Sequence, residues 1–159
     1  MADDNRGLHA ALDLLSRRDR SEAEIRRRLR DKGIAEVEID AVFVRLRELN
    51  YLDDRRLAER IVAAALSAGR GYGIRLVQDL AKRGIPRDIA DETLTRIAGE
   101  YDQRELIRGL LIRKFTAFDP TTADNRETAR VMNYLLRRGF SRSAVYDALK
   151  KQSAEFDDR

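Results

Sequence analysis

The sequence predicts an all-α fold of three tandem three-helix repeats, forming an elongated, curved array of about nine helices. The main observation is a pattern that occurs three times: a leucine, a glycine four residues later, and then a hydrophobic residue. Its members are Leu29, Gly33 and Ile34; Leu80, Gly84 and Ile85; and Leu135, Gly139 and Phe140. The glycines lie 51 and 55 residues apart (84 − 33 and 139 − 84). A period of this size is typical of arrays in which small units stack on one another.

Two further observations support this fold class. Apolar residues follow each glycine at fixed distances: Ile39, Ala90 and Val145 six residues on, and Phe43, Leu94 and Leu149 ten residues on. Charged residues make up 38% of the chain and aromatic residues only 6%, which suits long solvated helices. No sustained alternation of apolar and polar residues predicts a strand. Helical arrays usually bind extended partners along one surface, so the pattern favours a binding protein over an enzyme.

Each helix of the first repeat, residues 8–52, has its own signals, and we expect residues 1–7 to be disordered. The first helix is predicted by leucines at helical spacing, and Ser21 with Glu24 forms a capping box that starts the second. Gly33 ends the second helix, because glycine adopts a left-handed turn at little cost. Asn50 and Tyr51 end the third. The apolar residues of the three helices are Leu8, Leu12 and Leu15; Ile25 and Leu29; and Ile39, Val42, Phe43, Leu46 and Leu49.

The same order of elements recurs in a second repeat over residues 53–100 and a third over residues 101–152. In the second, Asp53 caps the first helix, a glycine-rich loop surrounds Tyr72, and Pro86 suits the first turn of the third helix. In the third, a longer loop over 115–125 separates the first two helices. Residues 153–159 are expected to form a flexible acidic tail.

Charge is distributed unevenly along the repeats, although the net charge is only +4. Eight basic and four acidic residues occupy 17–32, whereas two basic and six acidic residues occupy 33–54. Residues 70–87 and 126–142 each hold five basic residues and one acidic residue. The second helix of every repeat, with its flanks, is therefore basic. Stacked repeats would align these helices into a basic stripe, which is the expected footprint of a polyanion such as nucleic acid.

The candidate binding residues are the cations of these stretches and two tyrosines that could stack on bases. They are Arg26, Arg27, Arg28, Arg30 and Lys32; Arg70, Tyr72, Arg75, Lys82 and Arg83; and Arg130, Tyr134, Arg137 and Arg138. The alternative for any one arginine is a solvated helix face with local ion pairs, such as Glu22 to Arg26. The alternative for either tyrosine is a core position with an exposed hydroxyl. Three matched basic stretches favour binding.

Catalytic, metal and membrane sites are not predicted. The chain has one histidine, His9, and no cysteine, so neither a histidine-based triad nor a thiolate metal site can be assembled. Asp53 and Asp54 are explained as helix-capping acids. The stretch 69–73 lacks the lysine and hydroxyl residue that follow in a phosphate-binding loop. We find neither a signal peptide nor a membrane helix, and expect no cofactor and a cytoplasmic location.

The residues also resemble the RecX family of bacterial recombinase regulators. The resemblance lies in the run Ser21, Glu24, Ile25, Leu29, Gly33 and Ile34; in the run Leu49–Asp54 followed by Leu57 and Ala58; and in Arg70–Gly73 followed by Leu80, Gly84 and Ile85. It covers residues 8–97 well and the last third more loosely. Many members carry an aromatic residue where Leu57 and Ile61 stand here.

This resemblance implies a specific function. Family members are small basic proteins of tandem three-helix units that bind the RecA recombinase, chiefly as its filament on single-stranded DNA. They occupy the filament groove and suppress ATP hydrolysis and strand exchange. The chain is then expected to be a monomeric, non-enzymatic regulator in recombination and the SOS response. A free-standing helical DNA-binding protein, such as a helix-turn-helix-like transcription regulator, is the alternative. A structural scaffold is a third hypothesis, which applies if the basic stretches face in different directions.

Overall fold

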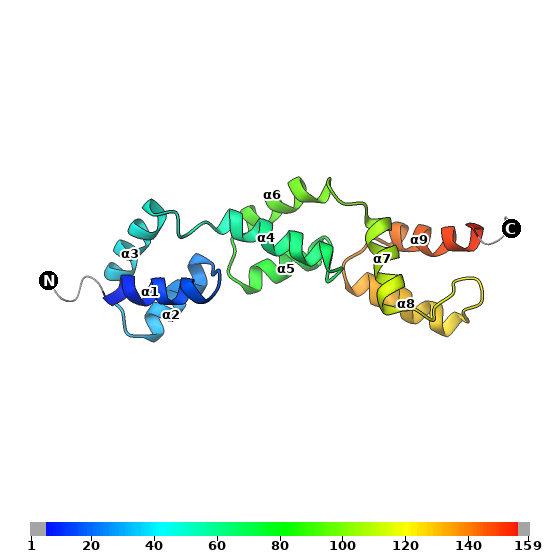
Figure 1. Ribbon diagram of the computed structural model, residues 1–159, viewed down its shortest axis with the longest axis horizontal. Coiled ribbons are helices and arrows are strands. Elements are labelled where there is room, and N and C mark those ends of the chain that lie inside the picture. Colours follow the sequence, from blue (N-terminus) through cyan, green and yellow to red (C-terminus); the bar gives the residue numbers. More distant parts are fainter. Residues whose placement is uncertain (1–5, 156–159) are drawn as a thin grey trace. The chain divides into compact units, whose positions relative to one another are not determined.

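The computed structural model describes residues 6–155, with the side chains of all except Ala98 and 151–155. This part of the chain contains nine helices and no strand, which confirms the all-α prediction (Figure 1). They are α1 (Arg6–Arg17), α2 (Glu22–Asp31), α3 (Glu36–Glu48), α4 (Asp54–Ser67), α5 (Ile74–Lys82), α6 (Arg87–Ala98), α7 (Gln103–Lys114), α8 (Asn125–Arg137) and α9 (Arg142–Glu155). The predicted disordered start and acidic tail lie largely outside the described residues, although α1 already begins at Arg6 and α9 reaches Glu155.

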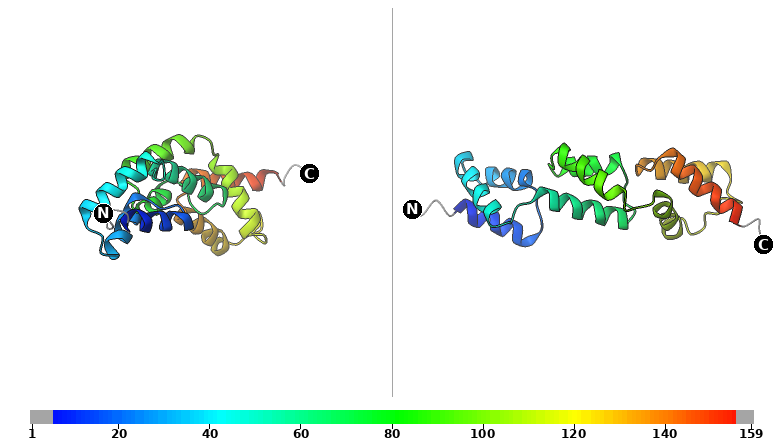
Figure 2. Two further views of the ribbon diagram at one scale, coloured as in Figure 1. Left: turned by 60° about the vertical axis from the view of Figure 1, so that its left-hand side comes forward. Right: turned by 90° about the horizontal axis from the view of Figure 1, so that it is seen from above.

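Contacts divide the described chain into two compact units. One comprises the residues up to Ile61 together with Asp79–Thr93, and the other comprises Val62–Gln78 together with the residues from Leu94. In the first unit α1, α2 and α3 pack against one another, and in the second α9 packs against α7 and α8 (Figure 2). The boundary passes through α4, α5 and α6, so the predicted second repeat contributes to both units.

The repeated leucine–glycine pattern is a helix-ending motif. Gly33, Gly84 and Gly139 all have positive φ, at 76°, 74° and 92°. In the first copy the Gly33 amide donates to the Arg30 carbonyl at 2.8 Å, and the Ile34 amide donates to the Leu29 carbonyl at 3.0 Å. This pair of bonds is the Schellman motif, in which the residue after the glycine packs on the last turn of the helix. The motif therefore requires a leucine, a left-handed residue and an apolar residue at this spacing.

The matched apolar positions lie in the cores of the two units, except Leu94, which is half-buried. Leu29, Leu80 and Leu135 are fully buried. The first unit contains a cluster of Ala11, Ile25, Leu29, Ile34, Ile39, Val42, Phe43, Leu46 and Leu52. The second unit contains a cluster of Ile107, Leu110, Leu111, Val131, Leu135, Phe140, Ala144, Val145, Ala148 and Leu149. Burial of roughly 0.8 kcal/mol per CH₂ makes these clusters the main source of stability in each unit.

Candidate nucleic-acid interface

The capping box predicted at the start of α2 is present. The Ser21 hydroxyl accepts a hydrogen bond from the Glu24 amide at 3.1 Å, and the Glu24 carboxylate accepts one from the Ser21 amide at 3.1 Å. Both groups satisfy amides that a helix start would otherwise leave without a partner. The cap fixes the first turn of α2 and hence the direction in which its arginines project.

Two of the predicted α2 cations are engaged by acids of α3. Arg26 Nη1 lies 2.6 Å from Glu36 Oε2, and its Nη2 lies 2.8 Å from Asp40 Oδ1. The Arg26 guanidinium also covers the Phe43 ring, 4.7 Å from its centroid. Arg30 pairs with Glu36, and this hydrogen bond lowers the pKa of the Glu36 carboxyl. The acidic third helix of the first repeat thus neutralises part of the basic second helix.

Other α2 cations have no such partner. Arg27, Arg28 and Lys32 are exposed. Within residues 6–150 their side chains form no hydrogen bond or ion pair. These three cations therefore remain available to an external anion.

Most of the candidates around α5 make contacts with other residues of the protein. Lys82 lies 3.4 Å from Asp79. Tyr72 is stacked on Phe140 with a 5.6 Å centroid separation and an 18° interplanar angle, and its amide donates to the Arg138 carbonyl at 2.7 Å. The half-buried Arg75 side chain lies against Gly71. Of the predicted residues in this stretch, Arg70 and Lys82 have exposed side chains, and the Arg70 carbonyl accepts a hydrogen bond from Arg138 at 2.7 Å.

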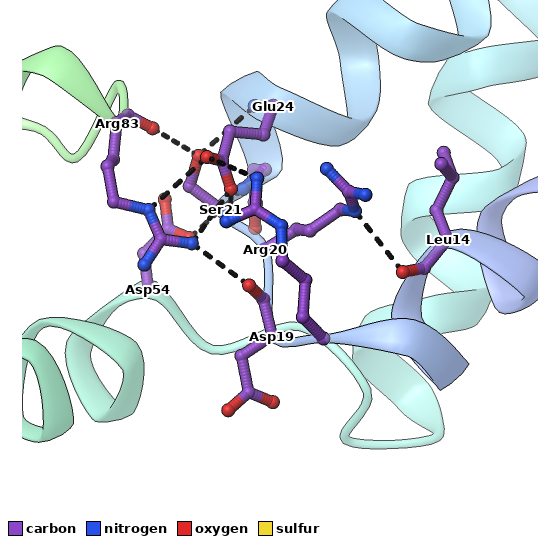
Figure 3. Close-up of polar contacts among 9 residues, drawn as sticks. Leu14, Asp19, Arg20, Ser21, Glu24, Asp54 and Arg83 are labelled. Atoms are coloured by element: carbon purple, nitrogen blue, oxygen red, sulfur yellow. Dashed lines mark hydrogen bonds and ion pairs between the residues drawn. The ribbon is translucent and has the colours of Figure 1, made fainter.

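Arg83 is the most strongly engaged of the candidates (Figure 3). Its Nε lies 3.2 Å from Glu24 Oε1, its Nη2 lies 3.0 Å from Glu24 Oε2, and Nη2 also donates to the Asp19 carbonyl at 2.9 Å. Burial acts to raise the pKa of the Glu24 carboxyl, but hydrogen bonds from the Arg83 guanidinium and the Ser21 amide outweigh it and hold that pKa below its usual value.

Asp54 lies beside this group and has the opposite electrostatic balance. Its carboxylate accepts a hydrogen bond from the Glu22 amide at 3.0 Å, which helps to satisfy the start of α2. Burial is the largest influence on this carboxyl and raises its pKa above the ordinary value. The sequence predicted Asp54 as an acid at a helix N-terminus, and it does lie in the first turn of α4. It also accepts a hydrogen bond at the start of a second helix, α2, which the sequence did not predict.

The α8 candidates form a basic stripe around an aromatic ring. Arg130, Arg137 and Arg138 each lie three or four residues from Tyr134, which places them along one side of the helix and its C-cap. Arg130 and Arg137 are exposed, and no hydrogen bond or ion pair engages their side chains within residues 6–150. We call Arg130, Tyr134, Arg137 and Arg138 the α8 stripe.

Sequence reasoning missed one member of this surface, Lys114. Its Nζ lies 5.1 Å from the centroid of the Tyr134 ring, and the Arg138 guanidinium lies 4.9 Å from the same centroid. Phe115 contacts the ring edge-on, with centroids 5.1 Å apart. Tyr134 is therefore surrounded by two cations and an aromatic neighbour. The available signal was the basic last turn of α7, which ends in Arg113 and Lys114.

Metal-binding clusters and membrane-spanning helices are absent from the described part of the chain. No group of three or more histidine, cysteine or acidic residues there could hold a metal ion. None of the helices in residues 6–155 combines the length and the apolar character needed to cross a membrane.

Comparisons with known proteins identify the family. Residues 8–46 match the model of the RecX first three-helix domain, and residues 100–149 match that of the RecX third three-helix domain. The second match covers the part of the chain where the resemblance in sequence was looser.

Curated relatives match over most of their length. Regulatory protein RecX of Trichlorobacter lovleyi is 39% identical over 89% of this chain and 92% of the relative. Its namesake in Syntrophotalea carbinolica is 38% identical over 90% and 94%. A crystal structure of RecX from Lactobacillus salivarius has a TM-score of 0.77 at 24% identity, covering 97% of this chain and 99% of that one. A crystal structure of regulatory protein RecX has a TM-score of 0.76 at 28% identity, covering 93% and 73%. The chain belongs to the RecX family.

Proposed function

We propose that this protein is a non-enzymatic regulator of the RecA recombinase, which binds the RecA filament on single-stranded DNA and suppresses ATP hydrolysis and strand exchange. Membership of a family whose relatives are named regulatory proteins carries the regulatory role. We further propose that it acts as a cytoplasmic monomer. Binding in the filament groove would place one chain against successive recombinase subunits.

The α8 stripe supports the nucleic-acid part of this proposal. Arg130 and Arg137 are exposed cations without an ion-pair partner in residues 6–150, and Lys114 lies over the ring of Tyr134 in the same stripe. Exposed arginines neutralise phosphates and release counterions, which supplies most of the affinity of non-specific DNA binding. Arg27, Arg28 and Lys32 on α2 offer a second set of cations of the same kind.

The regulatory role is tested by titrating the protein into RecA, single-stranded DNA and ATP while ATP hydrolysis is followed. We expect hydrolysis to fall at or below one protein per recombinase subunit. An unchanged rate across a wide titration would refute the proposal. Binding to single-stranded and duplex DNA alone separates the alternative, because a free-standing transcription regulator should prefer a duplex of defined sequence.

The DNA surface is tested with the double variant R130Q/R137Q. Two lost phosphate contacts should lower the slope of log affinity against log salt by about 1.4, because each contact to a single strand contributes roughly 0.7. The matched control is R17Q/R87Q, which removes two exposed arginines that form local pairs with Asp13 and Asp91. If both double variants change the slope equally, net charge rather than the α8 stripe determines binding.

A further inference from the structure

Arg83 and Arg138 occupy the same position in two repeats, directly before the motif glycines Gly84 and Gly139. Both guanidiniums donate to a main-chain carbonyl of the preceding repeat. Arg83 donates to Asp19 at 2.9 Å, and Arg138 donates to Arg70 at 2.7 Å. These acceptors are themselves equivalent, because each lies fourteen residues before the motif glycine of its own repeat (33 − 19 and 84 − 70).

The carbonyl groups of the same two arginines also contact equivalent positions. The Arg83 carbonyl accepts a hydrogen bond from the Ser21 hydroxyl, and the Arg138 carbonyl accepts one from the Tyr72 amide at 2.7 Å. Ser21 and Tyr72 each lie twelve residues before a motif glycine (33 − 21 and 84 − 72). Each arginine thus joins the end of one second helix to the start of the second helix in the repeat before it.

The glycines permit this close approach. A Cβ on Gly84 would overlap the Cβ of Ala23, and a Cβ on Gly139 would overlap the carbonyl oxygen of Tyr72. Around Gly33 no described atom lies within 4 Å of the same position. The glycine therefore has a second role in the second and third repeats, which the first copy of the motif does not share.

The two contacts differ in their chemistry. The first is ionic: Arg83 forms two hydrogen bonds with Glu24, whose side chain is only 11% exposed. Arg60 and Asp19 add a second ion pair between the same repeats at 3.0 Å. The second contact uses carbonyl acceptors, the Tyr72–Phe140 stack and Leu110 against Gly69. None of these second-contact interactions involves a carboxylate.

We propose that the arginine–glycine pair is a latch between successive repeats, and that the first latch is held by the Arg83–Glu24 ion pair and opens at high salt, whereas the second is held by apolar and carbonyl contacts and stays closed. Salt screens an ion pair at a partly exposed junction but strengthens apolar burial. Opening the first latch releases α1–α3 from the end of α5 while each core remains folded. Arg83 and Arg138 are then positioning residues rather than DNA contacts, and this inference does not depend on the proposed function.

The test measures distances across each latch. The chain has no cysteine, so introduced pairs can be spin-labelled selectively. The exposed positions Ala41 and Ala81 report on the first latch, and Ser67 and Asn133 report on the second. We expect a longer, broader distance distribution across the first latch when salt is raised from about 0.1 M to about 1 M, and no change across the second.

The variant E24Q sharpens the test, because glutamine preserves the capping box but removes the charge. We expect its open fraction across the first latch to be at least about tenfold higher than in the unaltered chain, since a charge-assisted hydrogen bond of this kind typically contributes that much. E92Q is the matched control, because it removes the exposed Arg55–Glu92 pair in the same unit. Unchanged helix content by circular dichroism excludes unfolding of α2. If E24Q and high salt leave the first distance unaltered, or shift both distances alike, the ionic latch is refuted.

Discussion

Substituting alanine at the three motif glycines tests the stacking of repeats, because the same local change meets three different environments. At Gly33 the new methyl group has no neighbour within 4 Å, so the cost is that of a positive φ, about 1 kcal/mol. At Gly84 the methyl overlaps Ala23, and at Gly139 it overlaps the Tyr72 carbonyl. Overlap adds about 1–3 kcal/mol, and displacing Tyr72 also loses its hydrogen bond to the Arg138 carbonyl, worth about 1 kcal/mol.

We therefore expect the free energy of unfolding to fall by about 1 kcal/mol in G33A, about 2–4 kcal/mol in G84A and about 3–5 kcal/mol in G139A. Urea unfolding followed by circular dichroism measures the total, and amide exchange assigns the loss to a unit. The double variant A23G/G84A removes the atom with which the new methyl collides, so it should recover the overlap part of the loss at position 84, about 1–3 kcal/mol, less the roughly 1 kcal/mol that a glycine costs within α2. Equal costs at Gly33 and Gly139 would show that only the helix ends matter and that the repeats do not dock through these glycines.

Three further predictions concern charged and aromatic groups. Because the folded pKa of Glu24 is lowered, its stabilising contribution is complete above its unfolded pKa and is lost as pH falls through the folded value, so in urea titrations E24Q should destabilise the first unit at pH 7 and have a smaller effect as the pH is lowered below the unfolded pKa. The pKa of Asp54 is raised, so burial of its charged form lowers the folding stability, and this cost disappears on acidification. D54N should therefore retain stability at pH 7, whereas D54A should lose about 1 kcal/mol because the Glu22 amide loses its acceptor. Tyr134→Phe should keep full affinity for single-stranded DNA in a fluorescence anisotropy titration, whereas Tyr134→Leu should weaken it because Lys114 loses the ring that positions it, and equal affinities of the two variants would exclude this role.

The parts of the fold that the sequence predicted correctly depend on local chemistry. Ser21 and Glu24 form a capping box within one helical turn, and the Schellman motif joins residues no more than five positions apart. Such patterns carry their own physical requirements, so they can be recognised without knowledge of the tertiary structure. The matched apolar positions also follow from helical periodicity, because one face of each helix must be buried.

Whether a predicted binding residue is free to bind a ligand depends on contacts with residues distant in sequence, which the sequence did not reveal. The sequence predicted Arg26 as a binding residue, but acids of α3 engage its side chain, and one of them, Asp40, lies fourteen residues away in sequence. Arg83 contacts Glu24 across 59 positions, which requires knowing how one repeat docks on another. Lys114 was missed because it lies outside the matched basic stretches and approaches Tyr134 only through the packing of the second unit.

Equivalence between repeats therefore supports two opposite conclusions about a charged residue. Matched cations can line a shared surface for an external ligand, but they can equally form the contact by which each repeat docks on the one before. Arg83 and Arg138 illustrate the second case, because their side chains donate to equivalent carbonyls. Lys32 holds the same position in the first repeat, yet its exposed side chain makes no ion pair within residues 6–150. A repeated cation is thus evidence for ligand binding only where the docking contact is absent, which excludes Arg83 and Arg138. Among the others, Arg27, Arg28, Lys32, Arg70, Arg130 and Arg137 are favoured because their exposed side chains form no ion pair within residues 6–150.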